Sequence, residues 1–135
     1  MIKAGEAERD RIGEWLKSQH GGRDPRPVFW VNHAPPKGAA VSWNGKRDLG
    51  DAMLLSWIEE YTPALVISGH VHNAPYYAEG SWVDKIGSTV VVNGGRASGE
   101  IPTTILVDIR EGRLIWSGME GRQEETFDAV SRRES

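Results

Sequence analysis

Two short apolar runs, separated by a helical pattern, constrain most strongly what this chain can fold into. Residues 28–31 (VFWV) and 64–68 (ALVIS) each follow a proline, and each has the length and composition of a strand buried on both faces. Residues 51–61 lie between them and place apolar side chains at helical spacing, with Asp48 or Asp51 available as the cap. A strand–helix–strand unit is almost always a right-handed crossover, so we expect the two strands to be parallel in one sheet.

Antiparallel strands are expected in the second half of the chain, and a further helix at its start. Residues 3–19 are charged, with a stripe of Ile12, Trp15 and Leu16, which predicts an amphipathic helix with that stripe packed on the core. Strands are predicted at residues 88–92, 103–109 and 113–117, the last two joined by a hairpin turn. Residues 120–135 are polar, and we expect a loosely ordered tail there.

Composition excludes several classes of protein. The 135 residues suit a single domain, with a helix at about 1–20, a core at 28–117 and a flexible tail at 120–135. The absence of cysteine excludes disulfides, a thiol nucleophile and Cys-based metal sites. No apolar run approaches the length of a membrane span and no signal-peptide pattern is present, so a cytoplasmic protein without a membrane partner is expected. A formal net charge of −3 makes nucleic acid an unexpected partner.

Three of the four histidines directly follow the two predicted parallel strands. His33 follows the first strand, and His70 and His72 follow the second. Because parallel strands end at the same edge of a sheet, we expect all three side chains at the carboxyl edge, where open α/β sheets place their ligands. Converging neutral imidazoles suit a borderline metal such as Mn, Fe, Zn or Ni, which can activate water. A single His at a strand end is more often an ordinary hydrogen-bonding loop residue, so the hypothesis depends on the three occurring together.

Two further residues are candidates for substrate binding. Asn73 follows His72 directly, and Arg96 ends the segment Asn93-Gly94-Gly95-Arg96. That segment is compatible with a backbone nest that holds a phosphate beside the Arg guanidinium. Both patterns are equally typical of turn residues, so the sequence leaves the two interpretations open.

These histidine segments resemble two signatures of the calcineurin-like metallophosphoesterases. The resemblance lies in Asn32-His33-Ala34-Pro35-Pro36 and in Val66 to His72, with residues 87–95 similar to the segment that follows in the family, and it covers about residues 10–117. It implies a four-layer αββα sandwich and a hydrolase of phosphoesters, a phosphatase or phosphodiesterase. It also implies two divalent metal ions, His33 and His70 binding one and His72 the other, with a bridging hydroxide that attacks phosphorus.

The family signatures that normally come first are absent from this chain. These are an Asp-x-His pair, a bridging Asp and an Asn-His-Asp/Glu element, and Gly50-Asp51 lies in the wrong place to supply the bridging Asp. The resemblance therefore implies the C-terminal part of the sandwich, a single partial domain over residues 1–135. We expect such a part to form a homo-oligomer or to pair with a separate N-terminal half.

Two alternatives to this hydrolase remain. One is a non-catalytic binding or assembly module that keeps the fold and its histidines. The other is a single-metal site made by the three histidines and a water, as in zinc hydrolases. Metal-dependent hydrolysis of a chromogenic phosphodiester separates an enzyme from a module.

Overall fold

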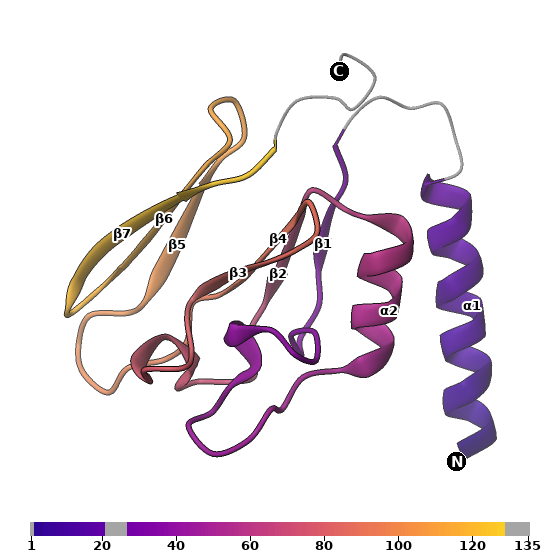
Figure 1. Ribbon diagram of the computed structural model, residues 1–135, viewed down its shortest axis with the longest axis horizontal. Helices are drawn as coiled ribbons and strands as arrows, with labels where there is room; N and C mark the ends of the chain where they lie inside the picture. Colours follow the sequence, from indigo (N-terminus) through magenta and orange to yellow (C-terminus); the bar gives the residue numbers. More distant parts are fainter. Residues whose placement is uncertain (1, 21–26, 129–135) are drawn as a thin grey trace.

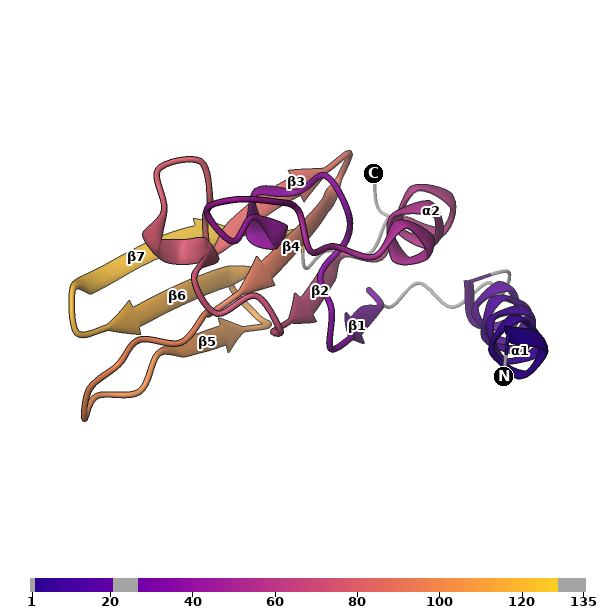
Figure 2. The ribbon, with the colours of Figure 1, turned by 90° about the horizontal axis from the view of Figure 1, so that it is seen from below.

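A four-stranded sheet forms the centre of the fold. The computed structural model describes residues 2–20 and 27–128, and Figures 1 and 2 show the arrangement of their elements. The sheet order is β1 (Phe29–Val31), β2 (Leu65–Ser68), β4 (Thr89–Asn93) and β3 (Val83–Ile86). β1, β2 and β4 are parallel, and β3 is antiparallel to β4. The predicted parallel pairing of the two apolar runs is thus confirmed, with Trp30 opposite Val66.

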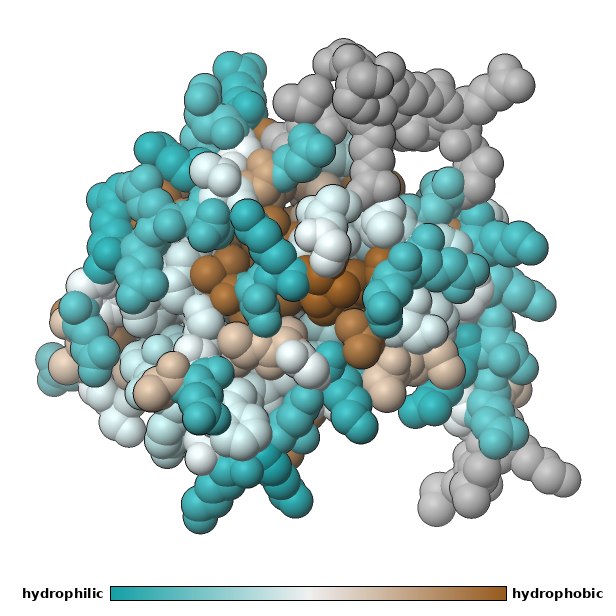
Figure 3. Space-filling model, viewed as in Figure 1, coloured by the Kyte–Doolittle hydropathy of each residue, from teal (hydrophilic) through white to brown (hydrophobic). Residues whose placement is uncertain are grey.

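Helix α2 (Ala52–Tyr61) is the crossover between β1 and β2 and covers one face of this sheet. Its buried residues are Leu54 and Ile58. They belong to a cluster that joins the helix, the short 3₁₀ helix η1 (Ala40–Ser42) and the sheet: Ala39, Val41, Leu54, Ile58, Val66 and Val91. Figure 3 shows hydrophobic residues gathered between β3 and α2, with hydrophilic and intermediate residues over most of the remaining coloured surface.

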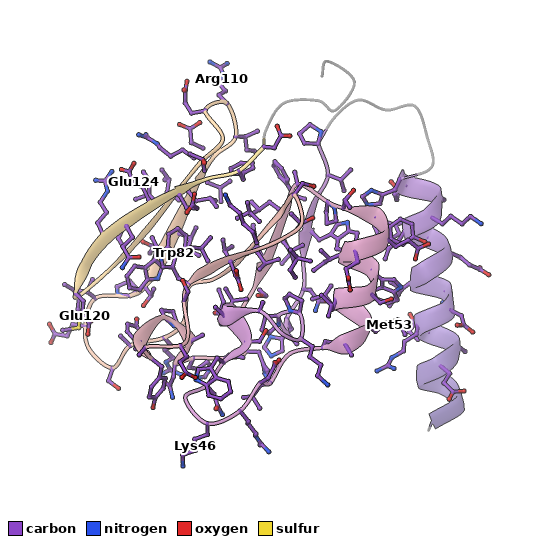
Figure 4. All side chains as sticks on the ribbon, viewed as in Figure 1. Lys46, Met53, Trp82, Arg110, Glu120 and Glu124 are labelled. Carbon is purple, nitrogen blue, oxygen red and sulfur yellow. The ribbon has the colours of Figure 1, made fainter. Side chains whose placement is uncertain are left out.

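A second sheet packs on the opposite face. It contains β5 (Thr104–Asp108), β6 (Arg113–Gly118) and β7 (Gly121–Thr126), all antiparallel. The core between the two sheets consists of Leu65, Trp82, Val90, Val92, Leu114, Trp116 and Phe127. Trp82 and Trp116 are stacked with ring centroids 6.2 Å apart, and the Trp82 indole N–H donates to Gln123 Oε1 at 2.9 Å. Figure 4 shows Trp82 between β3 and the strands of the second sheet.

Helix α1 (Ile2–His20) lies beside α2, away from the sheets. Its Leu16 is buried, and the Gly13 carbonyl accepts a hydrogen bond from the Tyr61 hydroxyl. At its end, His20 Nε2 accepts a hydrogen bond from the Trp30 indole at 3.2 Å. The described residues therefore form a helical layer and two sheets, a mixed α/β fold, as the sequence predicts. None of the described helices is long and apolar enough to cross a membrane.

Three expectations from the sequence are wrong. Residues 29–31 form an edge strand and not one buried on both faces, and Val31 is 82% exposed. The apolar stripe of α1 is not packed as a whole, because Trp15 is 58% exposed and Ile12 is also exposed. The polar stretch expected as a tail contains β7 (Gly121–Thr126), since its backbone pairs with β6; residues 129–135 lie outside the described residues.

The cap of α2 gives a first stability prediction. Asp51 Oδ1 accepts hydrogen bonds from the amides of Met53 and Leu54 at 2.8 and 3.1 Å, so it is the N-cap. Substituting Asp51→Ala should lower the free energy of unfolding by about 1 kcal/mol, because these helix N–H groups lose their acceptor. Urea unfolding measures this, with the exposed Glu59→Ala on the same helix as the control. A cost no larger than that of the control would contradict the capping role.

Candidate functional site

The ends of β1 and β2 bring two of the predicted histidines together. The amide of Gly69 donates to the carbonyl of His33 at 2.9 Å, which ties the loop after β2 to the loop after β1. The His33 and His70 rings then lie with centroids 5.0 Å apart and an angle of 64° between their planes. Both residues are exposed, so the pair faces solvent at the carboxyl edge of the sheet. The sequence predicted this convergence from the parallel strands alone.

His70 has a backbone conformation that side-chain-bearing residues rarely adopt. Its φ is +65°, and the Val71 amide donates to the Gly69 carbonyl at 2.7 Å across it. A positive φ under an i→i+2 hydrogen bond is the geometry of the classic γ-turn, which is rare and strained. Strain of this kind persists only where the surrounding structure holds it, and it concentrates at binding and catalytic sites. The turn projects His70 from the sheet edge immediately beside His33.

A polar groove begins at His70 and runs along the loop after β4. Its volume is about 760 Å³. His70, His72 and Asn73 line it together with Asn93 and most of the loop that follows β4, including Arg96, Ser98, Glu100 and Thr103. The predicted substrate-binding residues Asn73 and Arg96 therefore share one groove with two of the predicted metal ligands. Arg96 and Glu100 give the groove both signs of charge.

The segment 93–96 does not form the backbone nest that the sequence allows. The Gly95 amide donates to Asn93 Oδ1, and the Arg96 amide donates to the His72 carbonyl, both at 2.9 Å. Because both amides are used within the protein, they are not directed at an anion. The exposed Arg96 side chain remains the feature of this segment that suits a phosphate.

The donor set fits part of a metal site. His33 and His70 lie side by side, whereas His72 lines the groove without joining them in a three-residue cluster. Within the described part of the chain, no group of three His, Cys, Asp or Glu side chains is arranged to hold a metal ion. Two neutral imidazoles suit one transition-metal ion as a partial set of ligands, but a complete two-metal centre does not fit the residues described.

Sequence reasoning missed three polar residues of the groove and the role of Asn93. Ser98, Glu100 and Thr103 lie in a loop without a recognisable motif, so nothing in the sequence pattern marks them. Asn93 directly follows three valines of a predicted strand. A polar amide at the end of such a strand indicates a side chain that can bond to neighbouring backbone groups, and this pattern could have identified Asn93.

Comparison with known proteins gives one informative similarity. No family model matches the chain, and no curated protein does. A solved crystal structure is similar with a TM-score of 0.54 and 23% sequence identity over 89% of this chain. The match spans 40% of the length of that protein. At this identity the likeness concerns the fold alone.

Proposed function

We propose that this chain carries the histidine part of a metal-dependent phosphoester hydrolase site of the calcineurin-like type. In this proposal the chain is the C-terminal part of a four-layer αββα sandwich. The observation that carries it is the convergence of His33 and His70 from two parallel strands, beside a groove that contains His72, Asn73 and Arg96. The sequence resemblance to the family favours the same assignment.

Five polar residues of the candidate site have chemistry that suits this proposal. His33 and His70 would hold one divalent ion, with His72 available to a second, and the candidates are Mn, Fe, Zn and Ni. Such ions, when bound, lower the pKa of a coordinated water and polarise a phosphoryl oxygen. The Arg96 guanidinium is suited to two oxygens of the phosphoester, and the Asn73 amide can donate to a third.

In this proposal the carboxylates of such a site come from outside the described residues. The described residues provide no third ligand next to His33 and His70. Either a second copy of this chain or a separate N-terminal half would supply them. This same observation favours one alternative, a binding or assembly module that retains the histidines without catalysis.

Metal titration tests the proposal directly. We expect Zn²⁺ or Mn²⁺ to bind the intact chain at pH 7.5, because imidazole nitrogens are good ligands for these ions. His33→Ala and His70→Ala should each weaken binding by about 10-fold or more, because each removes one of two adjacent ligands. Isothermal titration calorimetry measures the affinity and the number of ions. The control is His20→Gln, since His20 lies apart from the site and contacts Trp30 and Tyr61.

The outcomes separate the enzyme from the module. An equal loss of affinity in His33→Ala, His70→Ala and the control His20→Gln would contradict the proposed metal site. The absence of metal binding by the wild-type chain would also contradict it. Metal binding together with hydrolysis of a chromogenic phosphodiester supports the enzyme. Binding without hydrolysis, by a chain that is monomeric in light scattering, supports the module.

A further inference from the structure

Asn93 is a buried polar residue at the edge of the groove that joins two separate segments of the chain to its own turn. Its side chain is 1% exposed. Its Nδ2 donates to the carbonyl of Val71 at 2.7 Å and to that of Val41 at 3.0 Å, and its Oδ1 accepts from the Gly95 amide at 2.9 Å. Both N–H groups of the side-chain amide therefore donate to backbone carbonyls, and neither is left for solvent.

The most informative of these bonds is the one to Val71. Val71 lies between His70 and His72, and its own side chain is buried. The residues after Asn93 hold the same turn from the other side, because the Arg96 amide donates to the carbonyl of His72. The carbonyls of two consecutive residues, Val71 and His72, thus accept hydrogen bonds, one from the end of β4 and one from the loop that follows it.

These hydrogen bonds hold the strained turn at His70. His70 has a φ of +65°, which an unrestrained residue with a side chain avoids. The hydrogen bond from Gly69 to His33 fixes the start of the turn, and Asn93 fixes the carbonyl that follows His70. Without the hydrogen bond from Asn93, rotation of the His70 backbone toward a negative φ would move the side chains of His70 and His72.

We propose that Asn93 is a positioning residue that fixes the His70–His72 turn and so sets where the two imidazoles point. The metal-affinity part of this inference rests on the proposed function, whereas the turn geometry does not. A buried amide that satisfies backbone carbonyls can do this without touching a ligand. Groups of this kind affect metal affinity by orienting the ligands.

The test compares two buried polar residues at opposite ends of the same strand. Asn93→Ala removes the ties to the turn. Thr89→Val is the matched control, because Thr89 is equally buried and donates to the Pro63 carbonyl at 2.6 Å, far from the groove. Both variants are measured at a temperature at which circular dichroism shows them folded. Asn93→Ser, which keeps a small polar group, replaces Asn93→Ala should the latter not fold.

Three readouts follow the turn. We expect Asn93→Ala to shift the imidazole NMR signals of His70 and His72, to speed hydrogen exchange of the Arg96 amide, and to weaken Zn²⁺ binding by about 10-fold or more. Thr89→Val should leave all three as in the wild type. Histidine signals and Arg96 exchange that respond alike in both variants, or in neither, would overturn the inference. If wild-type protein binds no Zn²⁺, the proposed function fails, and the NMR readouts still decide the role of Asn93.

Discussion

Trp116→Ala is expected to lower the free energy of unfolding by roughly 3–5 kcal/mol, the range for emptying a buried aromatic site. Trp116 is 4% exposed and stacks on Trp82 between the two sheets. Its indole N–H donates to the Gly94 carbonyl at 2.9 Å, so the substitution also leaves a carbonyl next to Asn93 without this donor. Because β6 is joined to the central sheet largely through this core, the loss of packing should affect the whole molecule.

Thermal and urea unfolding measure this loss, with an expected fall in melting temperature of roughly 10–20 °C. The matched control is Trp15→Ala, which removes the same side chain from a position where most of it faces solvent. A change of about 0.5 kcal/mol or less is expected there. Equal costs at the two positions would contradict the placement of the core between the sheets.

Gly95→Ala is the second substitution with a large expected effect. Gly95 has a φ of +69°, and a Cβ there would lie 2.6 Å from Pro75 Cγ and 2.8 Å from the His72 carbonyl oxygen. The left-handed conformation alone costs about 1–2 kcal/mol for a residue with a side chain. Overpacking adds about 1–3 kcal/mol, so a total loss of roughly 2–5 kcal/mol is expected.

Gly87→Ala is the control that separates the two costs. Gly87 also has a positive φ, +58°, but a Cβ there would meet no atom within 4 Å. Its substitution should therefore cost only the conformational part. Urea unfolding of both variants gives the steric part by difference, and equal losses would show that the approach of Gly95 to the His72 loop is not close.

The parallel unit and its histidines were predictable because they depend on local patterns. The apolar runs that became β1 and β2, and the helical spacing between them, specify which strand ends share an edge. The hairpin of β5 and β6 was predicted for the same reason, since Arg110-Glu111-Gly112 is a turn signal between two apolar stretches. Once the strands are parallel, the meeting of His33 with His70 follows.

Other features of the fold could not be predicted, because they depend on contacts that the local sequence pattern does not show. β7 contains no apolar residue, and backbone pairing with β6 makes it a strand. β3 contains Asp84 and Lys85, so its pattern gives no strand signal. Val31 is exposed in a strand at the edge of the sheet. The hydrophobic pattern of a strand does not show whether the strand lies at the edge or in the middle of a sheet. The hydrogen bond between Asn93 and the Val71 carbonyl, which holds the turn after His70, joins residues 22 positions apart.

The shortness of β1 has a consequence for how long the histidine pair persists. β1 has three residues, and among the described strands β2 is its only neighbour. Edge strands of this length belong to the parts of a protein that open by local fluctuation, at a lower free energy than global unfolding. His33 follows β1, whereas His70 follows a strand enclosed on both sides. We therefore expect local opening of β1 to separate the two imidazoles more often than the protein unfolds as a whole, which hydrogen exchange of the β1 amides would measure.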